Sequence, residues 1–140
     1  MQEFNSDDVC RARWGTTIVS GAEDKDTSGH GTHVAGTIVG HTCGVAKQAQ
    51  VIAVKVFPDG KDVSTSNSNV MKGVEWSFHD AGQNIRRSVA NMSLGGPKSQ
   101  AMNDLIKATV NAGLAIVVAS GNKTVSDPLT RIACWYACSH

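Results

Sequence analysis

The sequence predicts an α/β fold in a chain of 140 residues. Three short apolar segments, 51–57, 88–94 and 114–120, have the lengths and residue types of buried strands. Segments with helical periodicity lie between them. Because alternating strands and helices form parallel βαβ units, we expect a parallel β-sheet with helices on both faces.

Two helices separate these strands. The first is expected over about residues 69–80, before Gly82. The second has Met102 and Ile106 at helical spacing, and Gly113 stands where a C-terminal cap belongs. In parallel sheets, ligands bind beyond the carboxyl ends of the strands, so the residues that follow each strand are the candidates for a site.

Composition excludes several classes of protein. The hydrophobic fraction of 41% supports a packed core, and a net charge of +1 gives no basis for binding nucleic acid or a membrane surface. No apolar run approaches the roughly 18 residues of a membrane span, and the first 15 residues have no signal-peptide core. The cysteines are irregularly spaced and define neither a pairing nor a redox compartment; they are Cys10, Cys43, Cys134 and Cys138.

The segment SGHGTHVAGT, residues 28–37, places ionisable rings among small residues. It predicts a short helix that starts near His30, with Thr27 or Ser28 as the N-cap. A ring at a helix start, directly after Gly29, is accessible to a reacting group.

A metal site is one alternative for this segment. His30 and His33 are three residues apart on the expected helix, and His41 and Cys43 follow nearby. A zinc site needs three or four ligands at set spacing, and no glutamate flanks either histidine to act as a base. We therefore assign no metal here. A purely structural role for both histidines is the other alternative.

Four segments resemble the subtilisin-like serine proteases, in that family's order: GHGTHVAGTIVG, GVAKQAQVIAVKV, ANMSLGG and VVASGN. The similarity is to the proteinase K group, particularly fungal vacuolar and alkaline proteases, and covers residues 4–122. Residues 123–140 depart from that pattern. The resemblance implies that residues 1–140 form a single, incomplete subtilisin-like catalytic domain, part of a three-layer fold.

The resemblance also implies roles for individual residues. His30 matches the catalytic histidine, which takes the proton of a serine hydroxyl and returns it to the leaving amine. His33 matches a second histidine with a structural role. Asn122 matches the asparagine whose amide stabilises the negative oxygen of the tetrahedral intermediate.

Two further segments match the family's substrate-binding walls. An extended peptide would pair with them as an added strand, in a broad or apolar pocket. The loop 62–67 corresponds to a second pairing edge but lacks the usual glycines. The matching residues are Ser93, Leu94, Gly95, Gly96, Ala119, Ser120 and Gly121.

The aspartate and serine of the triad have no matching motif in these 140 residues. No apolar strand with a terminal aspartate precedes His30, so we expect the chain to begin just after that position. No Gly-Thr-Ser-Met-Ala motif follows Asn122. The resemblance therefore predicts a serine endopeptidase represented by part of its catalytic domain. The alternative is an inactive truncated or splice-derived fragment that acts only as a binding or antigenic polypeptide.

The resemblance carries expectations about cofactors, partners and location. The expected partners are protein and peptide substrates, together with a propeptide or protein inhibitor, and the expected state is a monomer. We expect no cofactor in these residues, although calcium is compatible with the complete protein. The family's members are secreted or vacuolar.

Overall fold

The structure is a computed structural model that describes residues 5–6 and 9–120. The chain divides into two compact units, Met1–Asn69 and Val70–His140, which are described separately. Each unit contains two parallel strands and at least one helix, which confirms the predicted α/β class.

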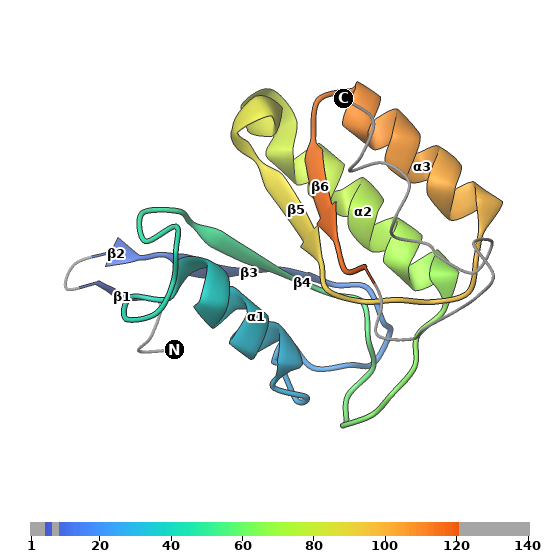
Figure 1. The fold of residues 1–140 in the computed structure, drawn as a ribbon. Helices are drawn as coiled ribbons and strands as arrows, with labels where there is room; N and C mark the ends of the chain where they lie inside the picture. The colour runs from blue at the N-terminus through green and yellow to red at the C-terminus, as the bar shows by residue number, and fades with distance from the viewer. Residues whose placement is uncertain (1–4, 7–8, 121–140) are drawn as a thin grey trace. The chain divides into compact units, whose positions relative to one another are not determined.

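The first unit contains a βαβ arrangement (Figure 1). Strand β3 (Ala12–Thr17) leads to helix α1 (His30–Val39), and strand β4 (Val51–Lys55) follows. β3 pairs in parallel with β4, and α1 lies against β4. A short antiparallel pair, β1 (Asn5–Ser6) and β2 (Val9–Cys10), precedes them. The expected strand at 51–57 is thus present in a shorter form, paired with a strand that we did not predict.

The sequence pattern does not predict strand β3, because Arg13 and Gly15 interrupt its apolar residues. The pairing register with β4 shifts between Trp14 and Thr16. Gly15 is therefore the extra residue of a bulge, a position that glycine commonly takes within a strand. Pairing with β4, rather than an alternating pattern of its own, makes this segment a strand.

The C-terminal end of α1 is held by a buried arginine. Nη1 of Arg11 donates to the carbonyl oxygen of Val39 at 2.8 Å and to that of Ala49 at 3.3 Å. Arg11 is only 6% exposed. A cation at this helix end interacts favourably with the partial negative charge of the last carbonyls. Arg11 thereby joins β3, α1 and the segment that leads into β4.

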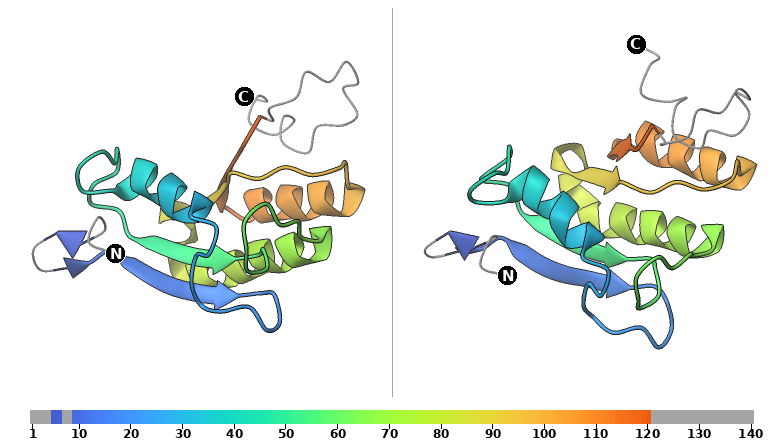
Figure 2. Two further views of the ribbon diagram at one scale, coloured as in Figure 1. Left: turned by 90° about the horizontal axis from the view of Figure 1, so that it is seen from below. Right: turned by 60° about the horizontal axis from the view of Figure 1, so that its bottom comes forward.

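The second unit begins within helix α2 (Asn67–Ala81). It also contains a 3₁₀ turn (Gly82–Arg87), strand β5 (Val89–Met92), helix α3 (Gln100–Asn111) and strand β6 (Ala115–Val118). β5 and β6 pair in parallel, and α3 lies beside α2 (Figure 2). Both predicted helices and both predicted strands are confirmed, with small shifts at their ends. The apolar core of this unit contains Val70, Val74, Met92, Met102, Ile106 and Leu114.

Helix α3 has a defined cap at each end. The side chain of Ser99 accepts a hydrogen bond from the N–H of Met102. At the other end, Gly113 has a φ of 110°, and its N–H donates to the carbonyl of Val110 at 2.9 Å. The N–H of Leu114 donates to the carbonyl of Thr109, which completes a Schellman motif. The predicted role of Gly113 as a helix terminator is confirmed.

Candidate active site

His30 is the first residue of α1, as the sequence predicts. The residue before it, Gly29, is the N-cap and has a φ of 84°, a conformation that favours glycine. Both residues are exposed. The left-handed turn at Gly29 ends the preceding loop abruptly, so the imidazole stands at the open end of the helix.

The carboxylate of Asp26 caps this helix. Its Oδ1 accepts from the N–H groups of Ser28 and Gly29 at 3.1 and 2.9 Å. Its Oδ2 accepts from both the N–H and the hydroxyl of Thr32 at 2.8 Å. The expectation that Thr27 or Ser28 is the N-cap is therefore wrong. Gly29 holds that position without a side chain, so a carboxylate three residues earlier takes over the capping function.

The same contacts shift the pKa of the Asp26 carboxyl. Partial burial raises the pKa of its carboxyl, but hydrogen bonds from the Thr32 hydroxyl and from the N–H groups of Thr32, Gly29 and Ser28 outweigh burial, and the net pKa is lowered. Asp26 thus places a negative charge at the N-terminal end of α1, where the helix dipole favours an anion.

The other carboxylate near the motif, Asp24, is engaged elsewhere. Its Oδ1 accepts from the hydroxyl of Thr17 at 2.6 Å, and that hydroxyl accepts from Nε1 of Trp14 at 3.1 Å. Within the described residues, no hydrogen bond joins His30 to Asp24 or Asp26. Neither aspartate therefore orients the imidazole as a triad aspartate does.

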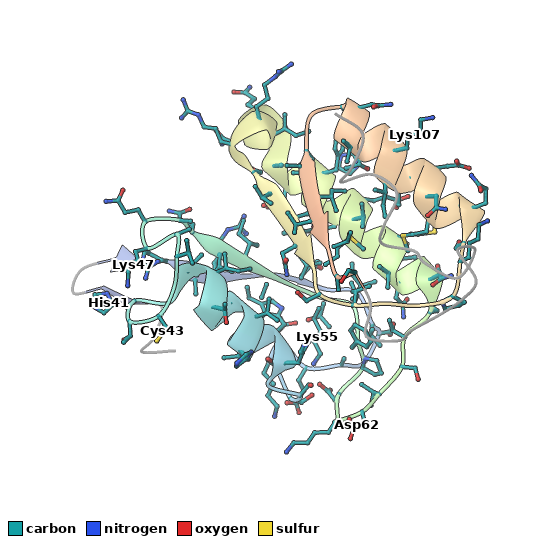
Figure 3. The ribbon with its side chains drawn as sticks, in the orientation of Figure 1. His41, Cys43, Lys47, Lys55, Asp62 and Lys107 are labelled. Atoms are coloured by element: carbon teal, nitrogen blue, oxygen red, sulfur yellow. The ribbon has the colours of Figure 1, made fainter. Side chains whose placement is uncertain are left out.

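His33 lies one turn further along α1 and is exposed. Its carbonyl accepts from the hydroxyl of Thr37 at 3.1 Å. It lines an open hollow of about 320 Å³ together with Thr32, Gly36, Thr37 and Cys43. Cys43 is a free, exposed thiol beyond the end of α1 (Figure 3).

No group of three or more histidine, cysteine, aspartate or glutamate side chains is arranged for a metal ion within residues 5–6 and 9–120. A zinc site built from His30, His33, His41 and Cys43 thus has no support from the geometry. Because a zinc ion needs three or four ligands, His30 and His33 alone do not form a zinc site.

The predicted substrate segments meet at the carboxyl edge of β5 and β6. Met92 pairs with Val118, and the N–H of Ala119 donates to the carbonyl of Met92 at 3.2 Å. Residues 93–96 and 119–120 therefore both follow the carboxyl ends of these two paired strands. Three residues of this group are exposed: Gly95, Gly96 and Ser120. The other three, Ser93, Leu94 and Ala119, are half-buried.

Two predicted site residues, Gly121 and Asn122, lie outside the described residues. The loop 62–67 is described. The loop lacks the glycines that the family usually has there. Asp62, with a φ of 56°, nevertheless adopts the left-handed conformation that favours glycine. The chain therefore makes a turn there that usually needs glycine.

Comparison with known proteins identifies relatives of this chain. Residues 3–133 match the model of the Subtilase family. The chain is 49% identical over 114 residues to Subtilisin-like protease 2 of Pseudogymnoascus destructans, covering 80% of this chain and 27% of that protein. It is 50% identical over 113 residues to a cuticle-degrading serine protease of Arthrobotrys oligospora, covering 81% and 26%.

A solved structure agrees with these relatives. The crystal structure of a cold-adapted subtilisin-like serine proteinase matches with a TM-score of 0.75 and 38% sequence identity, over 86% of this chain and 41% of that one. The chain therefore spans well under half the length of these proteins.

Proposed function

Because this chain belongs to the subtilase family, we propose that it supplies the general base and the substrate-binding segments of a serine endopeptidase. The position of His30 carries this proposal. An exposed imidazole begins α1, a glycine in a left-handed turn precedes it, and the bonds of Asp26 hold that turn. From this position the ring takes the proton of a serine hydroxyl and later returns it to the leaving amine.

The carboxyl edge of β5 and β6 provides the second part of the proposal. An extended peptide pairs with residues 93–96, and 119–121 form the opposite wall of the pocket. Exposed Gly95 and Gly96 support this role, because they allow another backbone to approach closely. Asn122 donates its side-chain amide to the oxyanion. Protein and peptide substrates with broad side-chain preference follow from backbone recognition of this kind.

The nucleophile and the orienting aspartate are not assigned to any residue of this sequence. A serine protease without its serine forms no acyl-enzyme, and residual catalysis is then small. We therefore propose that the 140-residue polypeptide is inactive on its own. A biotin-labelled fluorophosphonate should leave the purified polypeptide unlabelled, while a full-length subtilase in the same reaction is labelled. Covalent labelling of the polypeptide would refute this part of the proposal.

The role of His30 is tested where the aspartate and serine motifs are present. The DNA that flanks this reading frame is sequenced, and a product that carries both motifs is expressed. His30→Ala should then lower kcat by about 10⁶, the magnitude known for subtilisin itself. His33→Ala is the matched control on the same helix and should retain most of the activity. A message that ends at His140, together with no labelling, favours the non-catalytic polypeptide.

Asn122 is tested in the same product. Asn122→Ala should lower kcat by about 10²–10³ with little change in KM, again the magnitude measured in subtilisin. An unchanged kcat would remove Asn122 from the proposed oxyanion site.

Location and cofactors are further proposals. No described helix is long and apolar enough to cross a membrane. Resemblance to fungal proteases supports secretion or delivery to the vacuole. We propose no metal for residues 5–6 and 9–120, and a propeptide or protein inhibitor as the second kind of partner.

A further inference from the structure

Lys55, the last residue of β4, places its ammonium group among three oxygen atoms. Nζ donates to the carbonyl oxygens of Glu23 at 3.0 Å and Lys25 at 2.8 Å, and to Oδ1 of Asp59. Its side chain is only 10% exposed. An ammonium group has three N–H donors, so these oxygens match its full donor capacity.

Asp59 also contacts residues of the loop 23–27 directly. Its Oδ2 accepts from the N–H of Glu23 at 3.0 Å. The hydroxyl of Thr27 accepts from the N–H of Gly60 at 2.9 Å and lies 3.4 Å from Oδ1 of Asp59. Hydrogen bonds from Lys55 and Glu23 lower the pKa of the Asp59 carboxyl, which keeps the carboxylate ionised opposite the ammonium.

The loop held in this way is the one that leads into the candidate active site. Residues 23–27 include Asp26, whose carboxylate caps α1 and holds the turn at Gly29. Lys55 is itself fixed on β4, because its carbonyl accepts from the N–H of Ile18 at 2.9 Å. A short series of contacts therefore runs from the end of β4 through the loop to the first turn of α1.

We propose that Lys55 is a positioning residue for His30, and that its ammonium serves as a built-in cation that holds the loop 23–27 in place. A neutral residue cannot replace it. Without the cation, the carbonyl oxygens of Glu23 and Lys25 and Oδ1 of Asp59 would lose the ammonium donor that they share, and the loop would move apart. The catalytic consequence rests on the proposed function of His30, but the position of its ring is measurable without catalysis.

The test is Lys55→Ala in the 140-residue polypeptide, followed by NMR. The N–H groups of Ser28, Gly29 and Thr32 donate to Asp26 and report on the turn. In Lys55→Ala, their exchange with solvent should accelerate about tenfold or more, and the ring resonances of His30 should shift. Propylammonium replaces the atoms that the substitution removes, so it should return exchange to within about twofold of wild type. Tetramethylammonium has the charge but no N–H donors and should not.

Lys47→Ala is the matched control. Nζ of Lys47 also donates to two backbone carbonyls, those of His41 at 2.7 Å and Thr42 at 2.9 Å, but beyond the other end of α1 (Figure 3). It should leave the three N–H groups and the His30 ring unchanged. Equal effects of the two substitutions would overturn the proposal, because they would indicate a general loss of stability.

Asp59→Asn keeps the inference testable if Lys55→Ala does not fold. It removes the charge opposite Lys55 while it preserves shape, and it should accelerate the same three N–H groups. A folded Lys55→Ala or Asp59→Asn with unchanged exchange and unchanged His30 resonances would refute the role of Lys55. That result would leave fluorophosphonate labelling and the His30→Ala kinetics untouched, so the two proposals fail separately.

Discussion

Thr32 donates to Asp26 twice, through its backbone N–H and through its hydroxyl, and both hydrogen bonds reach Oδ2 at 2.8 Å. His30 lies between these two residues in the sequence. The pair therefore closes the loop around His30 and determines where α1 begins. A cap formed by a residue outside the helix has the same effect as an N-cap side chain, because it satisfies an N–H of the first turn.

Asp26→Ala should lower the free energy of unfolding by about 1 kcal/mol, the usual cost of a lost N-cap. Urea denaturation followed by circular dichroism measures the change. Ser28→Ala is the control, because only the backbone N–H of Ser28 takes part in the cap, and it should stay within about 0.5 kcal/mol of wild type. A larger effect of Ser28→Ala than of Asp26→Ala would contradict the assignment of the cap.

The contribution of Asp26 should disappear in acid. Its pKa is lowered in the folded chain, where burial raises it but hydrogen bonds from Thr32, Gly29 and Ser28 lower it more. A lowered folded pKa stabilises the fold fully above the unfolded value of about 3.9, and the stabilisation is lost as pH falls through the folded pKa. The difference in unfolding free energy between wild type and Asp26→Ala should thus be constant from about pH 7 to 5 and shrink below about pH 4. A difference that grows on acidification would show the opposite sign of shift.

Local patterns were sufficient to predict the second unit. Its strands are short apolar runs, and its helix α3 carries Met102 and Ile106 at helical spacing, with Gly113 as terminator. In each case the information lies within a few residues of the element. The start of α1 near His30 was likewise predicted from its own segment, although its N-cap was not.

Features that depend on distant residues were not predicted. Strand β3 exists through pairing with β4, which follows it by more than thirty residues. The oxygens around the Lys55 ammonium come from two loops. The sequence spacing of Glu23 and Asp59 does not predict that these two residues are in contact. Asp26 carried a weaker signal: a carboxylate close before a helix start is an anion that the helix dipole favours. We chose Thr27 or Ser28 because the helix boundary alone did not reveal the turn at Gly29.

Position 62 should tolerate substitution by glycine better than substitution by a β-branched residue. At a φ of 56°, an L-residue other than glycine is strained by about 1–2 kcal/mol, although aspartate is among the residues that tolerate it best. Asp62→Val should therefore destabilise the protein by about 1 kcal/mol. In Asp62→Gly, relief of strain is offset by the greater entropy of unfolded glycine, so the change should lie within about 0.5 kcal/mol. Lys61→Val, one residue earlier, is the control in urea denaturation. Equal destabilisation by Asp62→Val and Lys61→Val would show that backbone strain is not the cause.

Two glycines near α1 should respond in opposite directions to the same substitution. A Cβ on Gly44 would lie 2.2 Å from the nitrogen and 2.4 Å from the oxygen of Gly40. These are backbone atoms, and the N–H of Gly44 also donates to that oxygen at 2.9 Å, so the segment cannot move away without losing the bond. Gly44→Ala should therefore destabilise the protein by roughly 2–3 kcal/mol, as overpacking does elsewhere.

A Cβ on Gly36, in the middle of α1, would have no atom within 4 Å apart from its chain neighbours and the backbone of its own helix. Alanine is the better helix former by about 1 kcal/mol, so Gly36→Ala should stabilise the 140-residue polypeptide by up to that amount. Thermal and urea denaturation of both variants measure the contrast. Because each substitution adds the same methyl group, opposite signs would isolate the close approach at Gly44 as the cause. If both variants are destabilised to the same extent, the close approach of a Gly44 Cβ to the backbone of Gly40 is not the cause.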